Sequence, residues 1–202
     1  RSLLGVAGGT ATDSVDLAAA ATTSLVAYRA YLEGVRALFS WRMFAADSLF
    51  QVAIEADSGF ALAWHKRALA LGWGDATGPA YRQSTQRAVE LSGRLPAREQ
   101  ALVKGHDALS RGLTAQTTGS DGVAAYREAQ QIFRTLIATD SGVPEAWYGL
   151  GDALFHEPPK EDSLDAAGAR TTGAVRAFRR TLALDSTFHL AYSHLVQIYQ
   201  NL

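Results

Sequence analysis

Cysteine is missing from this chain of 202 residues. Its absence excludes a disulfide-bonded scaffold, a thiolate zinc site, an iron–sulfur cluster and a cysteine nucleophile. The chain also lacks an excess of either charge, because it has 19 basic and 20 acidic residues. General nucleic-acid binding requires a basic surface. No apolar run approaches the roughly 18 residues of a membrane span. We therefore expect no nucleic-acid partner and no direct membrane span.

The residues that are present favour a globular all-α protein. Hydrophobic residues make up 48% of the chain, and alanine, the best helix former, is abundant. Residues 1–21 are rich in Gly, Ala and Thr and predict a linker or a short leading helix, whereas 22–202 are predicted to form one domain. Because the chain starts with Arg1 rather than Met, we expect a segment of a longer or processed protein.

A short phrase occurs three times, beginning at Asp57, Asp140 and Asp185. In each copy Asp-Ser is followed two residues later by an apolar residue, and an aromatic residue closes the phrase four residues after that. We expect Asp-Ser to cap the following helix and the aromatic residue to point into the core. The aspartates lie 83 and 45 residues apart, which fits a period of roughly 34 residues with loop insertions near 112–122 and 156–168.

This pattern resembles the tetratricopeptide repeat (TPR) family. Trp147, Leu150, Gly151 and Leu154 match the first helix of the family's helix pair, and Phe178 matches the second. The resemblance implies an all-α, right-handed superhelical solenoid of antiparallel helix pairs. About nine helices are expected, at 22–39, 42–56, 60–73, 78–92, 96–111, 121–139, 144–155, 169–184 and 188–200.

The resemblance also implies that a partner binds in the concave groove, which the first helix of each pair would line. The groove residues predicted from the repeat register are Tyr28, Tyr31, His65, Leu69, Trp73, His106, Tyr148, Asp152, Phe155, His156, Ser193 and Gln197. This set is aromatic and lacks the Lys, Arg and Asn with which one TPR subtype holds a peptide's terminal carboxylate. It favours instead a protein or peptide segment with apolar anchors. Aromatic stripes at this spacing also pack in helical cores.

Catalytic and metal sites are not predicted. His65, His106 and His156 fall on three different repeats, whose first helices are expected to lie about 10 Å apart. His189 and His194 are five residues apart on one helix and do not share a face, so we expect ordinary packing and surface residues. No Gly-rich phosphate loop, nucleophile elbow or H-E-x-x-H helix is present. We therefore expect no catalytic residue, no metal ligand and no cofactor.

Two functions remain open at this point. The first is a non-catalytic scaffold that binds a protein segment in an open groove. The second is a small-molecule sensor with an enclosed pocket lined by Tyr28, Tyr31, His65, Trp73 and Tyr148. The stretch from Ser24 to Gly34, with the Asp-Ser phrases, also resembles the TPR-containing C-terminal region of bacterial multidomain signalling proteins. That resemblance implies an interaction or sensing module, which we expect in the bacterial cytoplasm.

Overall fold

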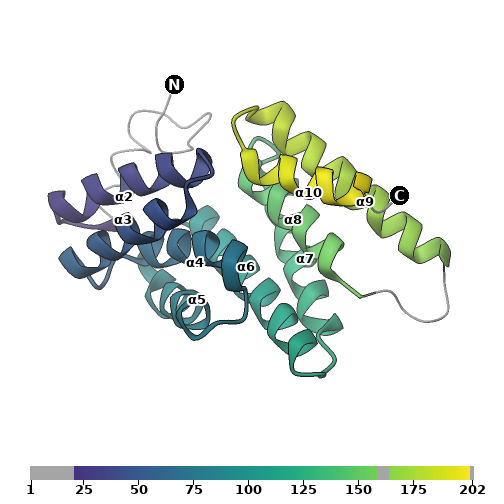
Figure 1. The fold of residues 1–202 in the computed structure, drawn as a ribbon, viewed down its shortest axis with the longest axis horizontal. Coiled ribbons are helices and arrows are strands. Elements are labelled where there is room, and N and C mark those ends of the chain that lie inside the picture. Colours follow the sequence, from purple (N-terminus) through teal and green to yellow (C-terminus); the bar gives the residue numbers. More distant parts are fainter. Residues whose placement is uncertain (1–20, 159–163, 201–202) are drawn as a thin grey trace. The chain divides into compact units, whose positions relative to one another are not determined.

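The computed structural model describes residues 21–158 and 164–200, with the backbone alone at 164–167. These residues form helices and connecting turns, without a β-strand in the described part of the chain (Figure 1). The α-helices are α2 (Leu25–Phe39), α3 (Met43–Ala56), α4 (Ala61–Asp75), α5 (Pro79–Leu91), α6 (Ala97–Thr117), α7 (Val123–Thr139), α8 (Pro144–His156), α9 (Leu164–Leu184) and α10 (His189–Gln200). A short 3-10 helix, Ser92–Arg94, follows α5.

The predicted all-α fold is confirmed for the described residues, and two helices are longer than expected. α6 continues to Thr117, so it covers the first half of the predicted insertion at 112–122. α9 begins at Leu164, within the predicted insertion at 156–168. The predicted leader at 1–21 lies outside the described residues except for Ala21.

The chain divides into two compact units, one reaching Val103 and the other starting at Lys104. In unit 1, α2 packs on α3, α3 on α4, and α4 on α5. In unit 2, α7 packs on α8, α8 on α9, and α9 on α10. Adjacent helices therefore form contacting pairs in each unit, as a helical repeat requires.

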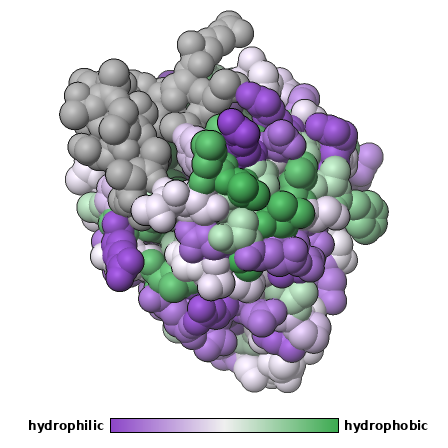
Figure 2. All heavy atoms as spheres, turned by 90° about the vertical axis from the view of Figure 1, so that its left-hand side faces the viewer, coloured by the Kyte–Doolittle hydropathy of each residue, from purple (hydrophilic) through white to green (hydrophobic). Residues whose placement is uncertain are grey.

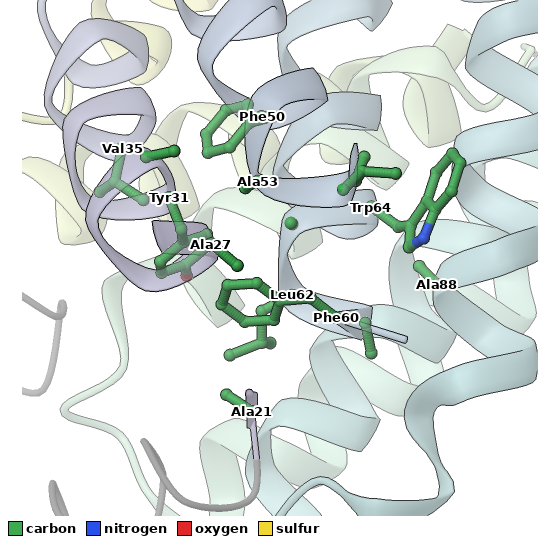
Figure 3. Packing of buried hydrophobic residues seen from close by; sticks show 14 of the residues in the cluster. Ala21, Ala27, Tyr31, Val35, Phe50, Ala53, Phe60, Leu62, Trp64 and Ala88 are labelled. Carbon is green, nitrogen blue, oxygen red and sulfur yellow. The ribbon is translucent and has the colours of Figure 1, made fainter. Parts of the chain in front are cut away.

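The core of unit 1 is built from small and aromatic residues. Tyr31 of α2 lies against two rings, with centroid distances of 6.0 Å to Phe50 and 4.9 Å to Phe60 (Figure 3). An alanine at Gly34 would place its Cβ 2.6 Å from the Phe50 ring, so only glycine permits this approach of α2 to α3. α2 and α3 pack closely because a glycine of α2 lies against a large aromatic ring of α3.

The same packing recurs inside unit 2. The Phe133 ring of α7 is held between Gly105 of α6 and Gly149 of α8, where added Cβ atoms would lie 2.6 Å and 2.3 Å from it. Phe178 of α9 packs on Gly151 of α8 in the same way, because a Cβ added at Gly151 would lie 2.7 Å from the Phe178 ring. These close approaches fix the register between neighbouring helices of the unit.

The repeated Asp-Ser phrase forms a turn after one helix rather than an N-terminal cap for the next. Asp57 and Asp140 are the C-cap residues of α3 and α7, and each carboxylate accepts a hydrogen bond from the backbone N–H two residues later, at 2.9 Å and 3.0 Å. Our expectation that the phrase caps the following helix is wrong for α4 and α8, whose N-cap positions make no side-chain hydrogen bond. Instead, the carboxylate stabilises the sharp change of direction between the two helices.

The aromatic residue of the phrase completes the same turn. The indole N–H groups of Trp64 and Trp147 donate to the backbone carbonyls of Ser58 and Ser141, both at 3.0 Å. Two turns of different units thus share an Asp side-chain bond and an indole bond at the same positions. These two joints are therefore alike in detail, whereas Tyr192, which closes the third copy of the phrase, is 46% exposed and does not point into the core as expected.

Large apolar side chains remain on the surface. Figure 2 shows apolar residues gathered between hydrophilic ones on one face. Among the described residues, the exposed large apolar side chains are Leu25, Val26, Trp41, Phe44, Val52, Tyr192, Val196 and Tyr199. No helix in the described ranges has both the length and the apolar character needed to cross a membrane.

Candidate functional site

The predicted groove residues of unit 1 divide into a buried and a half-buried group. Tyr31 and His65 are buried, whereas Tyr28, Leu69 and Trp73 are half-buried. The half-buried side chains belong to α2 and α4, the first helices of the two pairs, and these helices contact each other. We refer to these three partly exposed side chains on the contacting helices α2 and α4 as the apolar strip.

Aromatic contacts hold this strip in shape. Trp73, at the end of α4, packs edge to face on Trp41, with ring centroids 4.7 Å apart. Lys66 of α4 places its ammonium nitrogen 5.9 Å from the centroid of the Phe39 ring of α2, within cation–π range. Lys66 is itself buried, so its charge is largely withdrawn from the surface. The three strip residues themselves carry no charge.

Unit 2 contains a cluster of ionisable side chains that combines one carboxylate and two imidazoles. Asp152 and His156 are four residues apart and share a face of α8, while His194 reaches them from α10. The Oδ1 atom of Asp152 lies 3.2 Å from Nε2 of His156 and 3.2 Å from Nε2 of His194. The side chains are 12% exposed for Asp152, 32% for His156 and 5% for His194.

Hydrogen bonding in the cluster is uneven. Although two ring nitrogens approach it, the buried Oδ1 atom of Asp152 makes no hydrogen bond of normal geometry. The Tyr148 hydroxyl, in contrast, is hydrogen-bonded to Nε2 of His194 at 3.3 Å. Nε2 of His194 therefore lies between this hydroxyl and the Asp152 carboxylate.

The charges of the cluster stabilise one another. Burial alone would raise the pKa of Asp152, but the two imidazoles hold that pKa well below its ordinary value. Burial would lower the pKa of His156, yet its contact with the Asp152 carboxylate raises it. Burial, reinforced by the negative charge of Asp152, raises the pKa of Tyr126 to about 12. At neutral pH the Asp152 side chain is therefore a carboxylate, and it lies beside two imidazole rings.

An aromatic wall fixes the orientation of His194. Its ring stacks on Phe178 with a centroid distance of 5.0 Å and an interplanar angle of 17°. Phe155 lies against the same imidazole at 5.1 Å, and Tyr148 at 5.8 Å. Because its neighbours occupy several sides, the imidazole has little freedom to turn away from Asp152.

A second carboxylate next to the cluster is already paired. Glu157, directly after α8, is buried and accepts a hydrogen bond of 2.7 Å from the Gln130 side chain. Its other oxygen lies 3.4 Å from Nε of Arg127. The Glu157 charge is therefore compensated from α7, which leaves Asp152 as the carboxylate of the cluster.

The structure thus brings together four predicted groove residues of unit 2, namely Tyr148, Asp152, Phe155 and His156. His106 is buried in α6, and Ser193 and Gln197 are half-buried in α10. The sequence analysis missed His194, because it compared that residue only with His189 on the same helix. No pattern within α10 could have found it, because the approach of His194 to Asp152 depends on the packing of α8, α9 and α10.

No family model and no curated protein matches this chain in sequence. The chain's own residues offer a partly exposed apolar strip on α2 and α4 and a convergent Asp-His-His cluster between α8 and α10.

Proposed function

We propose that the chain is a TPR-like helical repeat module whose function is to bind a protein segment, with no reaction of its own. The observation that carries this proposal is the recurrence of one joint, with the same Asp side-chain bond and the same indole bond, before α4 and before α8. The proposal includes stacking of the helix pairs into a right-handed superhelix. In such arrays the first helices face the partner.

The strip on α2 and α4 supports a protein segment as the ligand. Its half-buried members, Tyr28, Leu69 and Trp73, are large and carry no charge. Side chains of this type form the central anchors of protein interfaces, surrounded by a polar rim. The absence of an exposed basic group among them argues against capture of a terminal carboxylate or a phosphate. An extended or helical segment with apolar side chains fits this surface best.

Site-specific cross-linking tests the proposal. Benzoylphenylalanine is placed at position 28 or 69, on the strip, or at position 44 on α3 as the control. Phe44 is 94% exposed, so the control position is more accessible than either test position. After irradiation in bacterial lysate, we expect one protein segment to cross-link from positions 28 and 69 and not from 44.

The affinity of the identified segment then decides the assignment. We expect Leu69→Ala to weaken binding at least tenfold, equivalent to about 1.4 kcal/mol, because a half-buried interface anchor is lost. Val52→Ala on α3, which removes an exposed apolar side chain of the second helix, serves as the matched control and leaves the affinity unchanged. Equal losses in both variants contradict the strip assignment. A bound small molecule in native mass spectrometry, without a cross-linked protein, would support the sensor instead.

A further inference from the structure

We propose that Asp152, His156 and His194 form a binding site for a divalent transition-metal ion of the Zn²⁺ class. The three residues lie within unit 2, and their candidate ligand atoms all lie within 4.8 Å of one another. The site is separate from the apolar strip on α2 and α4. The proposal of a metal site does not depend on the proposal that the chain binds a protein segment.

The distances within the cluster match those of a metal coordination sphere. Zinc is bound by imidazole nitrogen and carboxylate oxygen at about 2.0–2.2 Å, so two ligands of a tetrahedral site are separated by about 3.3 Å. The Oδ1 atom of Asp152 is 3.2 Å from each of the two Nε2 atoms. Two of the three edges of the ligand triangle therefore have the length that one shared ion produces.

The lack of a hydrogen bond at Asp152 points in the same direction. Buried carboxylate oxygens normally accept hydrogen bonds, because leaving them unsatisfied is costly. Here the Oδ1 atom is buried beside two imidazoles and still lacks a bond of normal geometry. A cation placed between the three atoms would satisfy this oxygen directly and neutralise its charge.

The ligand set selects the class of ion. Two imidazoles and one carboxylate suit Zn²⁺, Fe²⁺, Ni²⁺ or Cu²⁺, whereas Mg²⁺ and Ca²⁺ prefer sites made wholly of oxygen. Three protein ligands leave at least one coordination position for water. His156 is the most exposed ligand, with 32% of its side chain accessible, and it gives an ion a path from solvent.

The scaffold around the ligands is already organised. Asp152 and His156 are held one helical turn apart on α8, and Phe178 stacks on the His194 ring. An ion at this position would link α10 directly to α8, in addition to the packing of α10 on α9. We therefore expect the bound metal to stabilise the position of α10 in unit 2 by linking it to α8.

Metal titration of the untagged full chain tests this proposal. After treatment with a chelator, Zn²⁺ is added and followed by calorimetry, and Co²⁺ is added separately and followed by its visible absorption. We expect one ion per chain and a higher Tm in the presence of Zn²⁺. The five histidines give an internal control, because Zn²⁺ should shift the imidazole ¹⁵N signals of His156 and His194 and leave His65, His106 and His189 unchanged.

Three variants decide whether these residues are the ligands. His156→Gln and His194→Gln should each weaken Zn²⁺ binding at least tenfold, whereas His189→Gln, an exposed histidine of α10, should bind like the wild type. Circular dichroism verifies folding, and His156→Gln is the variant most tolerant of substitution because its side chain is the most exposed. Absence of binding, or equal binding by all variants, would overturn the proposal and identify the cluster as an Asp–His ion pair only.

Discussion

At the scale of single residues, the helices of this protein are held in register by aromatic rings that press against glycines. Phe133 shows this most clearly, because its ring is 2% exposed and has glycines of two different helices against it. Both glycines lie against the same end of the ring, since added Cβ atoms at Gly105 and Gly149 would lie 2.6 Å and 2.3 Å from its Cζ atom. A methyl group at either position therefore has no space available.

Gly149→Ala tests this packing. The new Cβ would lie 2.3 Å from the Phe133 ring, so the helices must separate or the ring must leave its rotamer. We expect a loss of about 1–3 kcal/mol in the free energy of unfolding, measured by urea denaturation. Gly168→Ala on α9 is the matched control, because nothing lies within 4 Å of its Cβ.

The control variant should move in the opposite direction. Gly168 is an exposed residue inside a helix, where alanine is favoured over glycine by about 0.5–1 kcal/mol. If Gly149→Ala did not lower the free energy of unfolding relative to Gly168→Ala, the argument that Gly149 permits a close approach to the Phe133 ring would be contradicted.

At the scale of elements, the turns between helices depend on a carboxylate that accepts a backbone bond. The Asp140 side chain accepts from the Gly142 N–H, and Asp185 accepts in the same way from Thr187 at 2.9 Å. Asp140 follows the C-terminal end of α7, where the helix dipole disfavours a negative charge. Its benefit must therefore come from the hydrogen bond rather than from its charge.

Asp140→Ala and Asp140→Asn separate these two contributions. The alanine variant loses the acceptor, and we expect it to be less stable by about 1 kcal/mol in urea denaturation. The asparagine variant keeps an acceptor oxygen and removes the charge, so we expect its stability to equal or slightly exceed that of the wild type. An asparagine variant as unstable as the alanine variant would show that the charge matters instead.

At the scale of the whole molecule, stability is distributed over two units with separate cores. The residues that surround Phe178, namely Tyr148, Gly151 and His194, all belong to unit 2. The ring cluster around Tyr31 belongs to unit 1. Helical repeats store their stability mainly in contacts between neighbours, so a local change is expected to have a local effect.

Phe178→Ala makes this expectation measurable. Removal of a fully buried phenylalanine should destabilise unit 2 by about 3–5 kcal/mol. Hydrogen exchange should then accelerate for the amides of α8, α9 and α10, while those of α2 to α5 keep their protection. Equal acceleration in both units would show that the chain unfolds as one cooperative body.

The sequence predicted the helices well because each signal for them is local. The nine expected helices are present among the described residues, since apolar periodicity and turn residues act within a few positions. The end of α6 was missed because the predicted break at Gly112 is a packing position instead. A Cβ at Gly112 would lie 2.9 Å from the Tyr126 ring, so this glycine permits close contact and does not end the helix.

Only part of the candidate cluster could be predicted from the sequence. Asp152 and His156 could be placed on one face of α8 from their spacing alone. His194 could not be added, because its approach to Asp152 depends on how α9 and the turn at Asp185 carry α10 back to α8. The same limit applies to Tyr31 and Tyr148, which pack against rings of other helices, Phe50 of α3 and Phe178 of α9.

The sequence by itself determined the all-α class, the order of the helices and the repeated joint, because helix propensity, periodicity and turn chemistry are properties of neighbouring residues. Only the tertiary structure decided which aromatic residues are buried and which polar groups meet. A buried contact depends on distances of a few ångströms between helices that are far apart in the chain. The convergence of Asp152, His156 and His194 is a property of that packing, and it is the feature most open to experimental test.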